Sequence, residues 1–179
     1  MQRALLLLAL CAVTLPGAGE LSGRRAPGFS LADTTGRQHD LQDYRGKWVV
    51  LEFFQSTCPH CAGFAGVLAQ AHARYAGRVQ ILSIAVYPDK GTDVLRFISG
   101  HKIQFPVMFD CGQVTASYYK ATPEKPTVEF PHVFLIDPQG TIRNDFGYSL
   151  LTRDIFEGKG LFRELDRLLG APAPPARKK

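Results

Sequence analysis

The feature that most constrains the fold of this 179-residue chain is the CPHC motif of residues 58–61, in which two residues separate two cysteines. An apolar run, VVLEFF at residues 49–54, comes just before the motif. After it, apolar residues recur at helical spacing, i, i+3, i+4, i+7 and i+11. This stripe consists of Phe64, Val67, Leu68, Ala71 and Tyr75. We therefore predict a redox-active dithiol at the junction between a strand and a helix.

The position of the motif at a helix start predicts a different role for each of its residues. Pro59 suits the first helical position, where its missing N–H costs nothing. The unpaired N–H groups and the helix dipole there favour a thiolate on Cys58, which we expect to be the exposed nucleophile. Cys61 comes one turn later and nearer the sheet, so we expect it to resolve the mixed disulfide that Cys58 forms with a partner. His60 can be cationic and can donate toward the thiolate, which makes it a further catalytic candidate.

Three other interpretations of the motif are a structural disulfide, half of a zinc site and a haem attachment site. A zinc site needs two more ligands, and the sequence has no second CxxC and no HxxxH to supply them. Haem attachment needs a histidine directly after the second cysteine, where this chain has Ala62. The motif and its context therefore favour redox catalysis, and we expect no resident metal and no cofactor.

The two ends of the chain predict export and a single domain. Residues 1–19 contain one early arginine, an apolar stretch shorter than the about 20 residues that span a bilayer, and a small-residue exit, which is the pattern of a signal peptide. Cys11 suggests a lipidation site, but the bulky Leu10 before it argues against one. Residues 20–170 fit one domain, and residues 171–179 look like a disordered, Pro-rich basic tail. We expect a periplasmic or otherwise extracytoplasmic protein.

Patterns along the rest of the chain predict alternating strands and helices. The expected strands are residues 29–31, 38–41, 49–54, 79–87, 105–109, 132–137 and 141–146. The expected helices, besides the one after the motif, are residues 92–100, 114–119 and 161–169. In the first of these, Val94, Leu95 and Ile98 are expected to face inward. Residues 137–140 (DPQG) are expected to form a hairpin turn in which Gly140 takes a positive φ.

The order of these elements is βαβ, then an inserted αβα, then ββα. Over residues 27–170 the chain resembles the thioredoxin fold, and in particular the extracytoplasmic TlpA/ResA-type thioredoxins. We therefore expect an α/β, thioredoxin-like fold with an N-terminal β-hairpin and an inserted helix-strand segment after the second core strand. The resemblance implies a thiol-disulfide oxidoreductase that exchanges disulfides with exported proteins through Cys58 and Cys61.

Two further positions match this family. Glu52 interrupts an otherwise apolar strand, where the resemblance implies a buried carboxylate that accepts the proton of Cys61. The alternative is a glutamate that faces solvent or forms a structural ion pair. Pro131 stands where the family has a cis-proline loop against the dithiol, with Phe130 and His132 flanking the substrate. The alternative there is an ordinary trans proline at a strand start.

The resemblance leaves the direction of electron flow open. The strand and motif are similar to those of the oxidising DsbA proteins, whereas the surrounding scaffold is similar to that of the TlpA/ResA-type reductants. ResA-type reductants carry an acidic residue three positions after the second cysteine, where this chain has Phe64. Cys111 lies at the end of a strand expected to be parallel to the central one, so it is either a third redox thiol on the dithiol rim or a small cysteine without a role.

Two alternative functions remain. A peroxiredoxin would share the insert, but its PxxxTxxC motif is absent because Leu51 and Gln55 occupy the Pro and Thr positions. A copper-handling metallochaperone would use the soft thiolates of the motif. The formal net charge of +5 is spread along the chain and says little about partners. We expect protein thiols and disulfides as substrates, a membrane protein as a candidate redox partner, no nucleic acid, and a monomer.

Overall fold

A computed structural model describes residues 19–170. The predicted tail, Cys11 and all but the last residue of the predicted signal peptide therefore lie outside the described residues. Within the described part, the expected alternation of strands and helices is confirmed, with most boundaries within two residues of the predicted ones.

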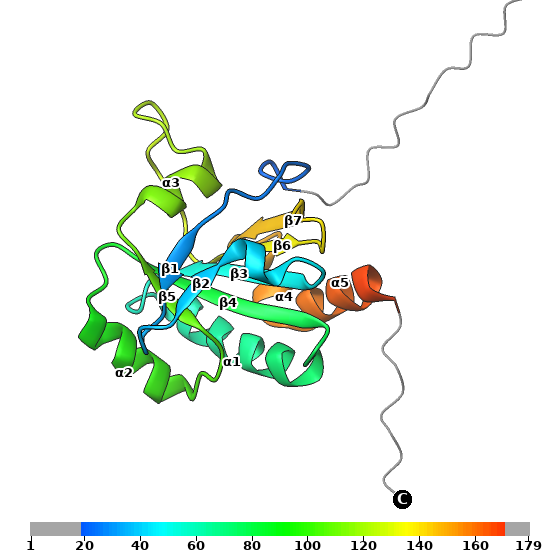
Figure 1. The fold of residues 1–179 in the computed structure, drawn as a ribbon, viewed down its shortest axis with the longest axis horizontal. Coiled ribbons are helices and arrows are strands. Elements are labelled where there is room, and N and C mark those ends of the chain that lie inside the picture. The colour runs from blue at the N-terminus through cyan, green and yellow to red at the C-terminus, as the bar shows by residue number, and fades with distance from the viewer. Residues whose placement is uncertain (1–18, 171–179) are drawn as a thin grey trace, which may run out of the picture.

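The central sheet has five strands in the order β5-β4-β3-β6-β7 (Figure 1). Their bounds are β3 Trp48–Phe54, β4 Val79–Val86, β5 Val107–Asp110, β6 His132–Ile136 and β7 Ile142–Gly147. Strands β3, β4 and β5 run parallel, whereas β6 runs antiparallel to both β3 and β7. A separate hairpin pairs β1 (Ser30–Ala32) with β2 (Gln38–Asp40), as expected. The carboxyl ends of the parallel strands and the start of β6 therefore meet at one rim.

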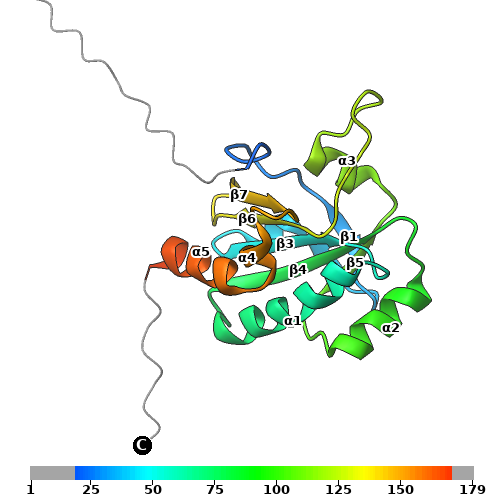
Figure 2. The ribbon, with the colours of Figure 1, turned by 180° about the vertical axis from the view of Figure 1, so that it is seen from behind.

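Helices cover both faces of the sheet. They are the 3-10 helix η1 (Leu41–Tyr44) and α1 Pro59–Arg74, α2 Gly91–His101, α3 Gln113–Tyr119, α4 Arg153–Phe156 and α5 Lys159–Leu169. Residues of α1, α2, α4 and α5 pack into one buried cluster, and residues of α3, η1 and the N-terminal segment pack into another. Figure 2 shows α1 and α2 on one side of the sheet and α3 on the other. The segment α2-β5-α3 is the expected insert.

Helix α1 begins where the sequence predicts. Cys58 is its N-cap and Pro59 is its first residue. The whole predicted stripe, from Phe64 to Tyr75, is buried against the sheet. Burial of this stripe fixes the rotation of the helix about its axis, and the same rotation places Cys61 in the core, where its exposed fraction is 0%.

The expectation that Leu95 faces inward is wrong, because its side chain is 53% exposed. Phe97 is buried instead, and its ring stacks on Phe54 with the ring centroids 4.9 Å apart. Val94 and Phe97 are three residues apart and share a helix face, whereas Leu95 is rotated by about 100° from Val94. Helix α4 was not expected either, because four residues are too few to show a helical period.

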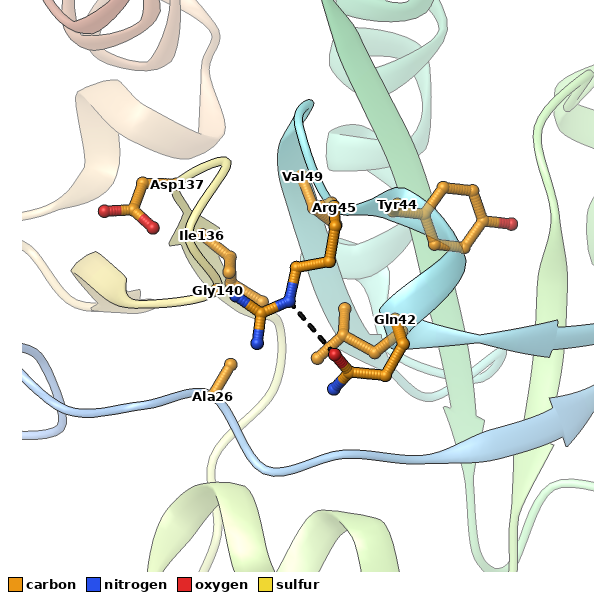
Figure 3. A pocket seen from close by; sticks show the side chains of 9 residues that line it. Ala26, Gln42, Tyr44, Arg45, Val49, Ile136, Asp137 and Gly140 are labelled. Carbon is orange, nitrogen blue, oxygen red and sulfur yellow. Dashed lines mark hydrogen bonds between the residues drawn. The ribbon is translucent and has the colours of Figure 1, made fainter.

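The turn between β6 and β7 lies at the end of the sheet away from the motif. Gly140 has a φ of 78°, as expected for this turn. A Cβ atom on Gly140 would come within 2.7 Å of the guanidinium carbon at the end of the flexible Arg45 side chain, which can move aside, so the positive φ is what favours glycine here. Figure 3 shows Arg45 reaching toward this turn while its Nε donates to Gln42 Oε1 at 3.0 Å. The cavity beside it measures about 10 Å³, room for no more than a water molecule.

Candidate active site

The two cysteines of the motif occupy different environments. Cys58 is half-buried at the rim, and Cys61 is fully buried; both are free thiols. The backbone N–H of Cys61 donates to Cys58 Sγ at 3.4 Å, as an N-cap side chain requires. The Cys58 thiol in turn points at the carbonyl oxygen of Phe130, 3.7 Å away. Helix α1 thus presents Cys58 to solvent and holds Cys61 behind it.

Burial raises the pKa of the Cys61 thiol far above its ordinary value, and the nearby Glu52 carboxylate raises it further. A thiol must lose its proton before it attacks a disulfide. Cys61 therefore needs a proton acceptor close by if it is to react near neutral pH.

Glu52 is the carboxyl group whose charge acts on Cys61. It lies in β3 with a 3% exposed side chain, on the face that α1 covers, and burial raises its pKa to about 8. The hydroxyl of Ser83 in β4 donates to Glu52 Oε2 at 2.5 Å and partly offsets this rise. The alternative of a solvent-facing Glu52 is wrong, and the structural ion pair is wrong too, because no ion pair of Glu52 exists within residues 19–170.

His60 is exposed at the rim, in the first turn of α1. Its ring stacks on Tyr148, with 3.9 Å between the ring centroids and 19° between the planes. Tyr148 follows β7, and its backbone N–H donates to the carbonyl oxygen of Pro131 at 3.1 Å. This one tyrosine therefore contacts both the CPHC motif and the loop that precedes β6.

The Phe130–Pro131 peptide bond is cis, so the alternative of a trans proline is wrong. Phe130 packs against the clusters on both faces of the sheet, and its carbonyl oxygen faces Cys58. These two predicted substrate residues thus lie beside the dithiol.

His132, the third predicted substrate residue, has its side chain on the other face of the sheet. It is buried, and its Nε2 lies 3.2 Å from Oδ2 of Asp145 in β7. Oδ1 of Asp145 accepts hydrogen bonds from the Ser22 hydroxyl at 2.5 Å and from the Leu21 N–H at 3.1 Å. Burial acts to raise the pKa of Asp145, but the hydrogen bonds from His132 and Ser22 hold it below its ordinary value.

A groove of about 380 Å³ lies beside Phe130 on the same rim. It is lined by Gln55 and Tyr87 on one side and by α3 and residues 121–128 on the other. Tyr87 is 78% exposed, so an aromatic ring borders the rim. Cys111 is exposed and follows β5, which is parallel to its neighbour β4 as expected. Its place on the dithiol rim is confirmed, while a redox role for it remains a prediction.

No helix within residues 19–170 is long and apolar enough to cross a membrane. The same residues contain no cluster of three or more His, Cys, Asp or Glu side chains placed to hold a metal ion.

Sequence reasoning missed three residues around the site: Ser83, Asp145 and Tyr148. Ser83 is the one hydroxyl residue in the apolar run of β4, the same kind of signal that identified Glu52. It could not be linked to Glu52 without the register of β3 against β4. No sequence pattern identifies Asp145 or Tyr148 as site residues, because the residues that they contact come from other strands and from α1.

The fold and the site define a class of protein, in which a thioredoxin-like fold carries a free CXXC dithiol at the start of a helix. The chain belongs to the AhpC/TSA family, whose profile matches residues 22–145. It is 31% identical over 134 residues to the thiol-disulfide oxidoreductase ResA of Geobacillus thermodenitrificans, covering 74% of this chain and 73% of that protein. ResA of Bacillus subtilis is 30% identical over 121 residues, covering 67% of this chain and 64% of that protein.

Solved structures with a similar fold also include proteins described as acting in disulfide exchange. A structure described as a thiol:disulfide interchange protein DsbE from Chlorobium tepidum matches with a TM-score of 0.64 and 28% identity, covering 79% of this chain and 96% of that one. A secreted Mycobacterium tuberculosis disulfide oxidoreductase shares the fold with a TM-score of 0.60 and 23% identity, covering 75% of this chain and 95% of that one. The present chain is therefore a thiol-disulfide oxidoreductase, and the peroxiredoxin alternative is less well supported.

Proposed function

We propose that this protein exchanges disulfides with exported proteins outside the cytoplasm, as a monomer, with Cys58 as the entering nucleophile and Cys61 as the resolving thiol. The observation that carries the proposal is the buried Glu52 carboxyl close to a buried Cys61, behind a half-exposed Cys58. The signal-peptide pattern of residues 1–19 and the likeness to a secreted oxidoreductase support the location.

In the first step, the Cys58 thiolate attacks one sulfur of a partner's disulfide. A bond forms between Cys58 and that sulfur, and the partner's other sulfur leaves as a thiolate. The N–H of Cys61 and the amino end of α1 stabilise the negative charge on Cys58 Sγ before the attack.

In the second step, Cys61 gives its proton to Glu52 and attacks Cys58 Sγ. The Cys58–Cys61 disulfide forms, the bond to the partner breaks, and the partner's second sulfur leaves as a thiolate. Two electrons have passed from the dithiol to the partner. The reverse sequence of the same steps oxidises a partner dithiol, so the site serves either direction.

The partner backbone has a place beside the dithiol. Once Cys58 is bonded to a partner sulfur, its own S–H is gone and the Phe130 carbonyl oxygen is free to accept an N–H from the bound segment. Pro131 and Phe130 then border the bound chain. His132 contributes by its position at the start of β6, with its imidazole held by Asp145.

His60 acts from the exposed side of the dithiol. An imidazolium there adds positive charge near Cys58 and favours its thiolate. The stack on Tyr148 limits the orientations that the imidazole ring can adopt.

Trapping of the mixed disulfide tests these roles. Reduced protein carrying Cys111→Ser is mixed with a fluorescent peptide joined by a disulfide to a coloured small thiol. The unaltered dithiol should release the coloured thiol and then the peptide. Cys61→Ala should release the coloured thiol but keep the peptide as a stable adduct by mass spectrometry, and Cys58→Ala should do neither. An adduct that accumulates with Cys58→Ala instead would overturn the proposal.

A further inference from the structure

Ser83 lies directly beside Glu52 in the sheet. The two residues are in register on the parallel strands β3 and β4, and both side chains are buried on the face that α1 covers. The Ser83 hydroxyl donates to Glu52 Oε2 at 2.5 Å. Within residues 19–170, this is the one side-chain hydrogen bond that the Glu52 carboxyl receives.

The surroundings of Glu52 make this single bond important. Burial penalises the charged carboxylate, and no cation within the described residues pairs with it. The titratable groups on which its charge acts are Cys61 of α1 and Tyr119 at the end of α3. The neighbouring strand β6 places Val133, which has no donor in its side chain, in register with Glu52.

We propose that Ser83 is a positioning residue for disulfide exchange, which holds Oε2 of Glu52, leaves Oε1 to take the proton of Cys61, and sets the pH range in which Glu52 can do so. This inference rests on the proposed role of Glu52. A hydroxyl donor favours the charged carboxylate, because it replaces one of the hydrogen bonds lost from water. Ser83 thereby keeps part of the Glu52 population ionised near neutral pH.

The same hydroxyl fixes the carboxyl group in space. A buried glutamate with no partner has several rotamers of similar energy, whereas a donor on a rigid neighbouring strand selects one. Because Ser83 and Glu52 are neighbours across a parallel ladder, their separation is set by the backbone. We therefore expect both the pH range and the rate of proton transfer to depend on Ser83.

The test compares Ser83→Ala with Ser83→Thr and with a matched control, Ser22→Ala. Ser22 also donates to a buried carboxylate at 2.5 Å, but that carboxylate is Asp145 on the other face of the sheet. The Glu52 carboxyl is followed directly, by NMR titration of reduced protein with isotope-labelled glutamate carboxyl carbons. Its signal is assigned as the one that Glu52→Gln removes.

Ser83→Ala should move the Glu52 titration upward by about one pH unit, since a hydrogen bond to a charged group has that effect. Release of the fluorescent peptide at pH 7 should then slow about tenfold, while release of the coloured thiol is unchanged. Ser83→Thr should keep the Glu52 titration and the rate of peptide release close to those of the parent protein, and Ser22→Ala should alter neither. Near-ultraviolet circular dichroism checks that each variant is folded.

The possible failures are distinguishable. If Glu52→Gln releases the peptide as fast as the parent protein, the proposed role of Glu52 fails. If Glu52→Gln slows release but Ser83→Ala leaves the titration and the rate unchanged, the role of Glu52 stands and the inference about Ser83 is overturned. If Ser83→Ala slows release without moving the titration, Ser83 is structural and the inference is again overturned.

Discussion

Glu52 and Asp145 are two buried carboxyl groups on opposite faces of the same sheet. Among the residues that the structure describes, Glu52 has one side-chain hydrogen-bond donor, Ser83, and burial raises its pKa to about 8. Asp145 receives hydrogen bonds from His132, Ser22 and Leu21, and its pKa is lowered although burial opposes this. Burial penalises the charge of both groups, more strongly for the deeper Glu52, and the additional donors of Asp145 outweigh that penalty.

This difference assigns the two faces different tasks. A carboxyl group with few donors changes its protonation near neutral pH and can exchange a proton with a thiol. A carboxylate with many donors stays charged and holds its partners in place. Asp145 holds the N-terminal segment and the start of β6 in place, so under the proposed role of Glu52 one face of the sheet serves the chemistry and the other the structure.

The largest expected effect is on the pH dependence of stability. The folded-state pKa of Glu52, about 8, lies above its ordinary value of 4.5, so the folded state binds the proton more tightly. Its contribution to stability is fully present below about pH 4.5 and is lost as the pH rises to about 8, by up to about 5 kcal/mol. Urea unfolding of the reduced protein across this range should show the loss, and Glu52→Gln should not. An equal loss of stability in Glu52→Gln would show that titration of Glu52 is not its cause.

Asp145 should show the opposite pH dependence. Its pKa is lowered in the folded state, so its contribution is present above its ordinary pKa and is lost only as the pH falls through the folded-state value. Asp145→Asn leaves His132 without its carboxylate and should lower the free energy of unfolding at neutral pH by about 2 to 4 kcal/mol. Urea unfolding measures this, and exchange by the folded protein should be retained. A stable Asp145→Asn protein that no longer exchanges disulfides would show that the role of Asp145 is not only structural.

A smaller effect should come from His60, the histidine of the CPHC motif. Removing an imidazole that can carry positive charge near Cys58 destabilises the reduced form, so His60→Leu should make the reduction potential more negative by about 10 to 30 mV. Equilibration against glutathione with counted thiols gives this potential. His101→Leu is a matched control, because His101 also contacts an aromatic ring, Phe97, but lies at the end of α2. A shift with His101→Leu as large as with His60→Leu would exclude a local effect.

The sequence was sufficient to predict the parts that depend on local pattern. The apolar run of β3, the stripe of α1 and the turn at Gly140 each carry their signal within a few residues. Contacts across strands were not predictable: the pairing of Glu52 with Ser83 requires the register of β3 and β4, and the pairing of His132 with Asp145 requires that of β6 and β7. Leu95 was misplaced because a short helix leaves the centre of its apolar stripe ambiguous.

The most direct test of the account is the pH profile of the second step, measured as peptide release from the mixed disulfide in the parent protein, Glu52→Gln and Asp145→Asn. The parent rate should rise with a midpoint near the Glu52 pKa of about 8. Glu52→Gln should lose this midpoint and be slower by about 10²-fold at pH 7, whereas Asp145→Asn should keep it. A Glu52→Gln protein that retains the parent midpoint and rate would show that Glu52 does not take the proton of Cys61.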